Sequence, residues 1–221
     1  MSKYRSIFEI IGPVMVGPSS SHTAGAVRIG QIARNVYGKN PAKAIITFYG
    51  SFAHTYSGHG TDVAIIAGIM KMETFDPRIP TAYLEAEKAG LAIEIKVSSE
   101  SVNFPNTAKV ELFGDKDYVS VVGISIGGGI VQIININGFD CHITGENPAV
   151  LVFHKDVKGR IAAVTNLIAK HEINVSHLEV SRHQKGEIAL MILQTDEHVA
   201  KHILKEMRKI KDITRVIQVK A

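Results

Sequence analysis

Cysteine is almost absent from this sequence, because Cys141 is the single cysteine among its 221 residues. One cysteine excludes an internal disulfide bond. It also excludes a cysteine-rich metal site or an iron–sulfur cluster built by this chain alone, since several thiolates hold such clusters. The sequence therefore predicts no metal site within this chain.

Long apolar runs and dense blocks of basic residues are also missing. No segment reaches the roughly 20 apolar residues that cross a membrane as a helix. The N-terminus lacks the apolar segment and cleavage site of a signal peptide. Lys and Arg number 25 against 21 Asp and Glu, and the basic residues are spread along the chain. These absences predict a cytoplasmic protein that binds neither membranes nor nucleic acid.

The residues that are present follow the pattern of an α/β protein in two domains. In the first domain, residues 1–144, β-branched residues cluster in segments that predict strands. These segments are 42–50, 91–98, 107–114, 117–126 and 129–139. Apolar residues at helical spacing predict helices between the strands. Their apolar faces hold Val27 or Ile29 with Ile32, Ala33 and Val36, then Val63, Ile66, Ala67 and Met70, and a third helix covers 80–90.

The second domain follows a predicted linker, "TGENPA" at 144–149, where Gly, Asn and Pro occur together. Residues 149–221 alternate strand and helix patterns in the order β-α-β-β-α-β. This order is typical of the ferredoxin-like fold. Because the edge strands of such a sheet are free to pair with another strand, we expect this domain to form a homodimer.

The stretch "GPSSSHT", residues 17–23, places three serines, a histidine and a threonine before the first predicted helix. One interpretation is a helix cap, which any of the serine hydroxyls could provide. The other is an anion site, since free N–H groups, the helix dipole and several hydroxyls converge where a carboxylate or phosphate would bind. We favour the anion site because capping needs one hydroxyl and this stretch offers more.

A second loop, "YGSFAHTYSGHGTD" at 49–62, places His59 between two glycines before the next helix. Flanking glycines indicate close backbone approach, and a histidine in such a loop is a candidate acid or base. A metal site at His54 and His59 is less favoured, because no acidic ligand stands at a familiar spacing. We expect Thr61 or Asp62, with Asp62 preferred, to cap the following helix.

The third element is "SIGGGI", residues 125–130, between two predicted strands. Three successive glycines indicate either a bulge or tight turn, or a loop whose N–H groups face an anion. No Lys-Ser or Lys-Thr pair follows, so this is not the phosphate loop of a nucleotide-binding protein. Both interpretations remain open from the residues alone.

Four motifs together resemble a known family. They are "GPSSSHTAGAVRIG", "FYGSFAHTYSGHGTD", "FPNTAKVEL" and "SIGGG", in this order and before the β-α-β-β-α-β pattern. The whole chain resembles the β subunits of bacterial iron–sulfur-dependent L-serine dehydratases, or L-serine ammonia-lyases, of the two-subunit type. Its C-terminal part resembles an ACT domain. The first part is also similar to the serine-binding regulatory domain of some bacterial phosphoglycerate dehydrogenases.

This resemblance implies a fold and an activity. The fold would be a mixed-sheet serine-dehydratase β domain followed by a ferredoxin-like ACT domain. The activity would be conversion of L-serine to pyruvate and ammonia, with a 4Fe-4S cluster carried by a partner α subunit and acting as a Lewis acid. The active site would lie at the seam between the two subunits. Residue chemistry together with the resemblance implies His59 first and His22 second as the catalytic acid or base. The implied substrate-binding residues are Ser19, Ser20, Ser21, Thr23, Thr61, Asn106, Ser125, Gly127 and Gly128.

The ACT-like part carries its own candidate site in "KDVKGRIAAV", residues 155–164. The resemblance implies that Asp156 and Gly159 bind an effector, whereas ordinary turn chemistry explains the same residues equally well. A lysine precedes Gly159 where many ACT domains carry proline, which weakens the case for an amino-acid effector. A monovalent cation such as potassium, or dimerisation alone, is equally compatible with the sequence.

Two other functions compete with the lyase. The chain could be a non-catalytic serine-sensing subunit, although it has no nucleotide-binding domain of its own. A hydrolase that uses Ser19 to Ser21 with His22 is less favoured. Adjacent residues do not by themselves form a nucleophile–base–orienting relay, and the sequence has no G-x-S-x-G elbow.

Overall fold

The computed structural model describes residues 13–219 of the chain. They divide into two compact units, and the division falls between Asn137 and Gly138. The predicted linker, 144–149, lies a few residues further along, in the second unit. No helix among residues 13–219 is long and apolar enough to cross a membrane.

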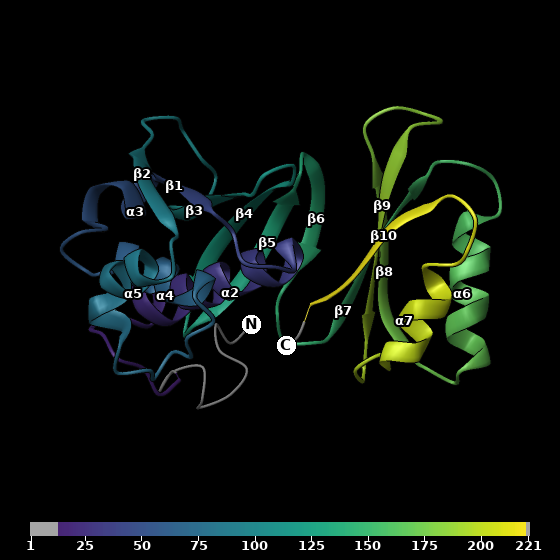
Figure 1. Cartoon of the computed structure of the whole chain (residues 1–221), viewed down its shortest axis with the longest axis horizontal. Coiled ribbons are helices and arrows are strands. Elements are labelled where there is room, and N and C mark those ends of the chain that lie inside the picture. The colour runs from purple at the N-terminus through teal and green to yellow at the C-terminus, as the bar shows by residue number, and fades with distance from the viewer. Residues whose placement is uncertain (1–12, 220–221) are drawn as a thin grey trace, which may run out of the picture. The chain divides into compact units, whose positions relative to one another are not determined.

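The first unit is a mixed α/β layer structure (Figure 1). Its strands are β1 (Lys43–Tyr49), β2 (Ala92–Val97), β3 (Asn106–Phe113), β4 (Tyr118–Gly127) and β5 (Ile130–Ile136). Its helices are η1 (Ser20–Gly25), α2 (Ala26–Tyr37), α3 (Gly50–Thr55), α4 (Thr61–Ile69), η2 (Ile79–Thr81) and α5 (Ala82–Lys88). The strands follow the order β2-β1-β3-β4-β5. β1 and β2 are parallel and the other neighbours are antiparallel, so the sheet is mixed, as predicted.

The sheet register brings three chain segments to one edge. Tyr49 at the end of β1 pairs with Thr107 at the start of β3. Thr107 in turn pairs with Ile124 near the end of β4. The loops that follow β1 and β4 and the loop that precedes β3 therefore meet at the same edge of the sheet, which is where the candidate site lies.

Helices α2 and α4 cross in very close contact. The predicted apolar face of α2 is buried, including Val27, Ile29 and Ile32. In α4 every residue from Ala64 to Ile69 is buried, so this helix is apolar on all sides rather than on one face. A Cβ atom on Gly68 would overlap the carbonyl oxygen of Val27, and one on Gly30 would overlap the carbonyl oxygen of Ile65. Glycine at both positions is what allows the two backbones to touch.

From β7 (Ala149–Lys155) onward the second unit has the predicted ferredoxin-like order. Its elements are β6 (Phe139–Ile143), β7 (Ala149–Lys155), α6 (Arg160–Lys170), β8 (Val175–Arg182), β9 (Ile188–Thr195), α7 (Lys201–Met207) and β10 (Ile213–Val219). The sheet β10-β7-β9-β8 is antiparallel throughout. Helices α6 and α7 lie on one face of this sheet (Figure 1), over a core that includes Val152, Met191 and Val216.

Two local differences from the predicted elements have clear causes. The strand expected over 129–139 ends at Ile136, because Asn137 (φ 52°) and Gly138 (φ 86°) form a tight turn before β6. Residues 50–55, expected as part of a loop, form the short helix α3. One and a half turns are too short for an apolar period to reveal.

The contact between α2 and α4 yields a stability prediction. Gly68→Ala should lower the free energy of unfolding by about 1–3 kcal/mol, because the new methyl group must push the two backbones apart. Thermal and urea unfolding followed by circular dichroism measure this. Gly58→Ala is the matched control, since its Cβ would lie 3.8 Å from the Thr55 carbonyl oxygen in ordinary contact. Equal stability of the two variants would contradict the glycine-mediated contact.

Candidate functional site

The "GPSSSHT" stretch forms the entry to the first helix. Ser19 is the N-cap (φ −144°, ψ 127°), and its side chain accepts a hydrogen bond from the His22 N–H at 3.3 Å. The next six residues form η1, a π-helical turn that runs directly into α2. Because the first N–H groups of a helix have no intrahelical acceptor, those of Ser20 and Ser21 face outward from the helix start. One serine is the cap, and the other two hydroxyls are left for another role.

The two predicted catalytic histidines lie side by side. The rings of His22 and His59 meet edge to face, with centroids 4.7 Å apart and planes at 89°. Phe52 of α3 packs on the His22 ring at 5.1 Å. His22 Nδ1 lies 3.3 Å from Ser19 Oγ, and Nε2 lies 3.0 Å from Thr55 Oγ1. Both ring nitrogens of His22 are therefore engaged by hydroxyl groups, while His59 is exposed.

The surroundings of His22 favour its neutral form. Burial, and secondly the neighbouring His59, lower the pKa of His22 from its usual value of 6.5. At neutral pH the ring is therefore uncharged and keeps one nitrogen lone pair. An imidazole in this state is able to accept a proton.

Strand β4 brings Ser125 against the helix entry. Ser125 is 5% exposed, and a Cβ on Gly25 of η1 would overlap its hydroxyl. The carbonyl oxygen of Ser125 accepts a bond from Asn106 Nδ2 at 3.4 Å. The hydroxyl-rich helix entry, Ser125 and Asn106 thus belong to one region at the sheet edge.

The three glycines after Ser125 make a bulge and a tight turn. The β4–β5 register shifts between Ser125 and Gly127. Gly127, Gly128 and Gly129 have φ values of 105°, 62° and 79°, which side chains other than glycine rarely adopt. The Gly129 carbonyl oxygen accepts a bond from Arg28 of α2 at 2.6 Å. The turn is thereby tied to the helix that follows η1.

Three buried hydroxyls near the helix entries have no hydrogen-bond partner within residues 13–219. They belong to Thr23, Thr61 and Ser125, and each residue is at most 5% exposed. Most buried hydroxyls in proteins are paired, so these atoms are available to a polar ligand. Thr61 does not cap α4, whose N-cap is Gly60 (φ 66°).

The preference for Asp62 as the cap of α4 is wrong. No side chain caps this helix. The Asp62 carboxylate instead accepts a hydrogen bond from the Tyr83 hydroxyl at 3.1 Å. The left-handed conformation of Gly60 sets the chain direction into α4 without a side-chain cap.

The chain does not supply an iron–sulfur site from the residues described. Cys141 is fully buried, and burial raises the pKa of its thiol to about 12. A thiol of this kind is a poor source of the thiolate that iron requires. Within residues 13–219 no three His, Cys, Asp or Glu side chains lie close enough together to hold a metal ion.

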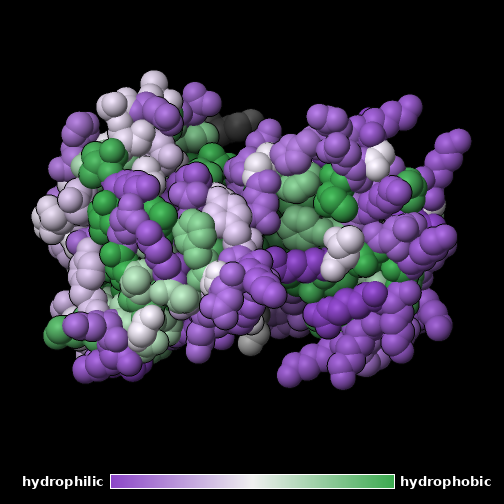
Figure 2. Space-filling model, turned by 45° about the horizontal axis from the view of Figure 1, so that its top comes forward, coloured by the Kyte–Doolittle hydropathy of each residue, from purple (hydrophilic) through white to green (hydrophobic). Residues whose placement is uncertain are grey.

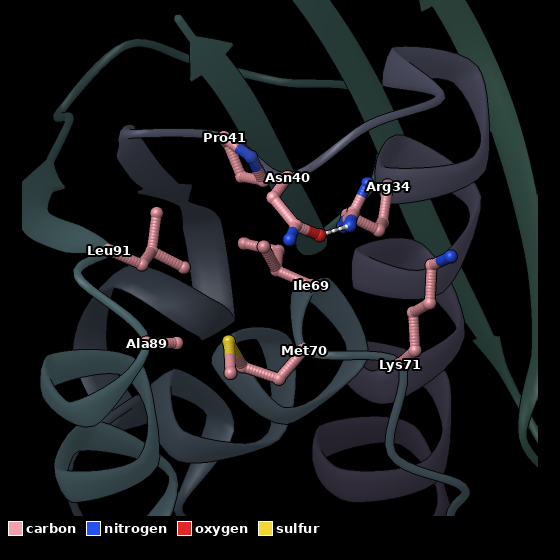
Figure 3. A pocket seen from close by; sticks show the side chains of 8 residues that line it. All are labelled: Arg34, Asn40, Pro41, Ile69, Met70, Lys71, Ala89 and Leu91. Carbon is pink, nitrogen blue, oxygen red and sulfur yellow. Dashed lines mark hydrogen bonds between the residues drawn. The ribbon is translucent and has the colours of Figure 1, made fainter.

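A cavity of about 170 Å³ lies at the other end of α2. Figure 3 shows Arg34 and Lys71 on one side of it and Leu91 and Ala89 on the other, with Arg34 bonded to Asn40. Arg34 is twelve residues beyond His22, which is roughly 18 Å along a helix. This cavity is therefore separate from the histidine pair.

The predicted effector residues lie in the second unit. The Asp156 carboxylate accepts bonds from Arg182 at 2.7 Å and from the Gly186 N–H at 3.2 Å, and these bonds lower its pKa. Gly159 precedes α6 with φ 85°, and a Cβ there would contact nothing within 4 Å. A cavity of about 420 Å³ begins beside Asp156. Its lining residues are Phe139, Lys155, His183, Gly186, Glu187, Ile188, Asp212 and Thr214.

Comparisons with known proteins agree with this architecture. Residues 6–134 match the family described as serine dehydratase beta chain, and residues 149–212 match the ACT domain. The chain belongs to the serine dehydratase beta-chain family. The resemblance inferred from the four motifs is thus confirmed, and so is the fold class with its C-terminal ACT domain.

Three relatives show how far the similarity extends. The "probable L-serine dehydratase, beta chain" of Bacillus subtilis is 51% identical over 98% of this chain and 99% of its own length. The L-serine dehydratase beta chain of Peptoniphilus asaccharolyticus is 37% identical over 87% of both chains. D-3-phosphoglycerate dehydrogenase of Bacillus subtilis is 28% identical over 69% of this chain, but over 29% of its own length.

Sequence reasoning missed two residues of the site, Thr55 and Arg28. Thr55 contacts His22 from α3, and Arg28 holds the glycine turn. A weak signal existed for Thr55, which follows Ser51 by four residues, the spacing at which a threonine hydroxyl bonds a helical carbonyl. That signal is usable only once residues 50–55 are known to be helical.

The pKa of His22 gives the next prediction. In a ¹⁵N NMR titration of the chain, His22 should titrate below 6.5, and His59→Asn should raise its pKa only part of the way back, because burial is the larger cause. The unfolded chain then binds the proton at higher pH than the folded chain, so His22 destabilises the fold as pH falls below about 6.5. A His22 pKa at or above 6.5 would contradict our assignment of this ring as partly buried and neutral. The exposed His177→Asn variant is the control and should leave the pKa of His22 unchanged.

Proposed function

We propose that this chain is the β subunit of an L-serine dehydratase that converts L-serine into pyruvate and ammonia. A partner α subunit would complete the enzyme and carry the four-iron, four-sulfur cluster, which the single buried Cys141 is unsuited to hold. The observation that carries the proposal is the contact between His22 and His59 beside a hydroxyl-rich helix entry, in a chain of this family. A β chain also implies a partner chain.

The reaction sets the tasks of the site. The α-proton and the β-hydroxyl of serine leave as water and give aminoacrylate, which rearranges to an imine. One water then hydrolyses the imine to pyruvate and ammonia, so no net water is consumed. The residues of this chain would bind the carboxylate, receive the α-proton and keep the reacting atoms in place. The cluster of the partner would supply Lewis acidity toward the departing hydroxyl.

The helix entry is suited to the serine carboxylate. The N–H groups and hydroxyls of Ser20 and Ser21 stand at the positive end of the helix dipole. The unpartnered hydroxyls of Thr23 and Ser125 lie in the same region. Loss of the α-proton builds negative charge on the carboxylate, and donors already in place stabilise that charge without reorganising. Asn106, Thr61, Gly127 and Gly128 complete our proposed substrate-binding set.

The histidine pair is suited to proton transfer. His22 is half-buried and neutral at neutral pH, which qualifies it as the base. His59 is exposed and touches the His22 ring, so it would serve as a second acid or base on the solvent side of the pair. Because two positive imidazoles at this distance repel each other, the pair favours one positive charge at a time.

The partner subunit has a suitable surface to cover. Phe104 precedes β3 and Ile126 lies near the end of β4, at the sheet edge that carries the site, and they are 44% and 53% exposed. Figure 2 shows hydrophobic residues among the hydrophilic surface of this unit. Exposed apolar side chains at the sheet edge that carries the site fit a surface that a partner buries. Covering it would exclude water from the reacting serine.

An activity assay distinguishes the roles of the two histidines in turnover from the role of Ser20 in substrate binding. With the purified partner under anaerobic conditions, the chain should form pyruvate from L-serine. His22→Asn and His59→Asn should each lower kcat by roughly 10²–10⁴ while assembly is retained. Ser20→Ala should mainly raise KM, by the loss of roughly 1–2 kcal/mol of binding to a charged group.

His177→Asn is the matched control, because His177 is an exposed histidine of the second unit. Activity of this chain without a partner, or iron bound in equal amount to the isolated chain, would reject the two-subunit proposal. Full turnover of both site-histidine variants would move the proton transfer to the partner.

A second candidate is a non-catalytic serine sensor. The 28% identity to D-3-phosphoglycerate dehydrogenase, over 69% of this chain, favours it. Under this alternative the chain binds serine but His22→Asn leaves the activity of every assembled complex unchanged. Calorimetry with serine, beside the turnover assay, distinguishes the two functions.

The ACT domain would regulate the enzyme and pair with a second copy. Asp156 and Gly159 remain our proposed effector residues, and the nearby cavity that Lys155 and Gly186 help to line could accept an amino acid or a monovalent cation such as potassium. The edge strand β8 exposes Leu178 and Val180, at 39% and 37%, which suits pairing with another sheet. Neither the effector nor the dimer follows from the family alone.

Regulation is tested by two substitutions at this turn. Asp156→Ala and Gly159→Val should alter the dependence of the rate on serine or potassium concentration, because the first releases Arg182 and the second forces a side chain into a left-handed conformation. Steady-state kinetics across both concentrations provide the measurement. Asp115→Ala removes an exposed carboxylate of the first unit and serves as the control. Unchanged curves for both variants would leave the domain without a regulatory role at this turn.

A further inference from the structure

We infer that Thr55 is a positioning residue that holds His22 in the tautomer with hydrogen on Nε2, so that Nδ1, beside the Ser19 hydroxyl, is the atom that accepts the proton. The inference deepens the proposed function and rests on it for its catalytic meaning. Its structural part, the tautomer, stands independently of any activity.

The hydrogen bonds of Thr55 decide which nitrogen carries the hydrogen. Its hydroxyl has one hydrogen, and Oγ1 lies 2.8 Å from the carbonyl oxygen of Ser51, which can only accept. That hydrogen is therefore committed to Ser51. Toward His22 Nε2, at 3.0 Å, Thr55 must act as the acceptor. Nε2 consequently carries a hydrogen.

The position of Thr55 on α3 keeps this arrangement in place. Ser51 and Thr55 are one helical turn apart, the spacing at which threonine bonds back to a helical carbonyl. The N–H of Ser51 is bonded at 2.6 Å to the carbonyl oxygen of Pro105 before β3, which anchors the helix to the sheet edge. The orientation of the His22 ring is thus set by the backbone of α3.

The other ring nitrogen of His22 is then free to act as the base. In neutral imidazole only one nitrogen carries hydrogen, so Nδ1 keeps its lone pair. Ser19 Oγ lies 3.3 Å from Nδ1 and accepts from the His22 N–H through its own lone pair. The hydroxyl hydrogen of Ser19 is therefore able to point at Nδ1. The donors therefore follow one order: Ser19 donates to His22, His22 donates to Thr55, and Thr55 donates to the carbonyl oxygen of Ser51.

A balanced proton transfer follows from this chain of bonds. The α-carbon of serine would give its proton to Ser19 Oγ while the hydroxyl proton of Ser19 moves to His22 Nδ1. Ser19 ends as the same hydroxyl, and His22 gains one proton and one positive charge. The electron pair of the broken C–H bond stays with the substrate and forms the double bond as hydroxide leaves.

Neutral hydroxyls suit a base that must release its proton again. A carboxylate beside an imidazole would stabilise the imidazolium form and raise its pKa. His22 instead has Thr55 and Ser19 on its nitrogens, with Phe52 and His59 against its ring. Among the described residues His59 is the one titratable neighbour that shifts it, and it disfavours the cation. The imidazolium would therefore form briefly and give up its proton again.

The test compares Thr55→Val, which removes the acceptor, with Thr55→Ser, which keeps it. Long-range ¹H–¹⁵N NMR of the histidine-labelled chain should show the Nε2–H tautomer of His22 in the wild type and in Thr55→Ser. Thr55→Val should show a mixture of tautomers. In the assembled enzyme, Thr55→Val should lower kcat about tenfold or more with a smaller change in KM, and Thr55→Ser should stay within about threefold.

Thr165→Val is the matched control. Thr165 lies in α6 and makes the same backward bond, to the Ile161 carbonyl oxygen at 3.1 Å, far along the chain from any site histidine. The Thr165→Val variant loses a helical bond of the same kind. Because Thr165 belongs to the second unit, the variant should change neither the tautomer of His22 nor kcat.

Each outcome bears on a separate part of the inference. An Nδ1–H tautomer in the wild type would overturn it, whether or not the enzyme is active. An unchanged tautomer in Thr55→Val would also overturn it, and the wild-type and Thr55→Ser spectra decide the matter if Thr55→Val does not fold. A changed tautomer with unchanged kcat would overturn the catalytic role of His22 Nδ1. Absence of serine turnover in the wild-type complex would instead reject the proposed function and leave the tautomer standing.

Discussion

Close backbone approach at the helix α2 is the constraint on which the first unit depends. Gly25 lets the helix entry touch Ser125 of β4, and Gly30 and Gly68 let α2 and α4 meet without side chains between them. With these contacts α2 is held against both the sheet and the helix α4, which is buried from Ala64 to Ile69. The π-helical turn that starts this helix is then fixed at the sheet edge. Close packing of the helix against the sheet places His22 within reach of Thr55 and His59.

The site that results differs from a charged catalytic centre. Its inner members are buried hydroxyls and a half-buried, neutral imidazole, and the residues described there include neither a metal-ligating set nor a carboxylate bonded to His22. Under the proposed function such a site would bind an anion through N–H groups and dipoles, and its neutral imidazole would accept a proton. Among the residues described there, no metal-ligating group is present that would hold a Lewis acid for a departing hydroxide. That missing function is what the proposed partner would add.

Much of this arrangement was predictable from the sequence, and the features that were not predicted left no recognisable pattern in it or were misread for a physical reason. β-branched segments predicted the strands, and the serine-rich stretch and His59 were recognised from residue type alone. Thr55 escaped because its role depends on a helix too short to leave an apolar period. The end of β5 was missed although "NG" at Asn137 and Gly138 is a strong hairpin signal. The cap of α4 was assigned to Asp62 by residue preference, whereas a left-handed Gly60 made a cap unnecessary.

His22 and His59 differ in exposure because one lies within a helical turn and the other lies in the loop between two helices. His22 lies inside a helical turn and is enclosed by α3, so burial keeps it neutral. His59 lies between two glycines after α3, where the chain turns toward α4 and the ring remains exposed. Two histidines in contact therefore differ in access to solvent, with His22 half-buried and His59 exposed. An exposed outer ring is of little use if bulk water surrounds the substrate, so this geometry acquires its catalytic value when another surface closes over His59.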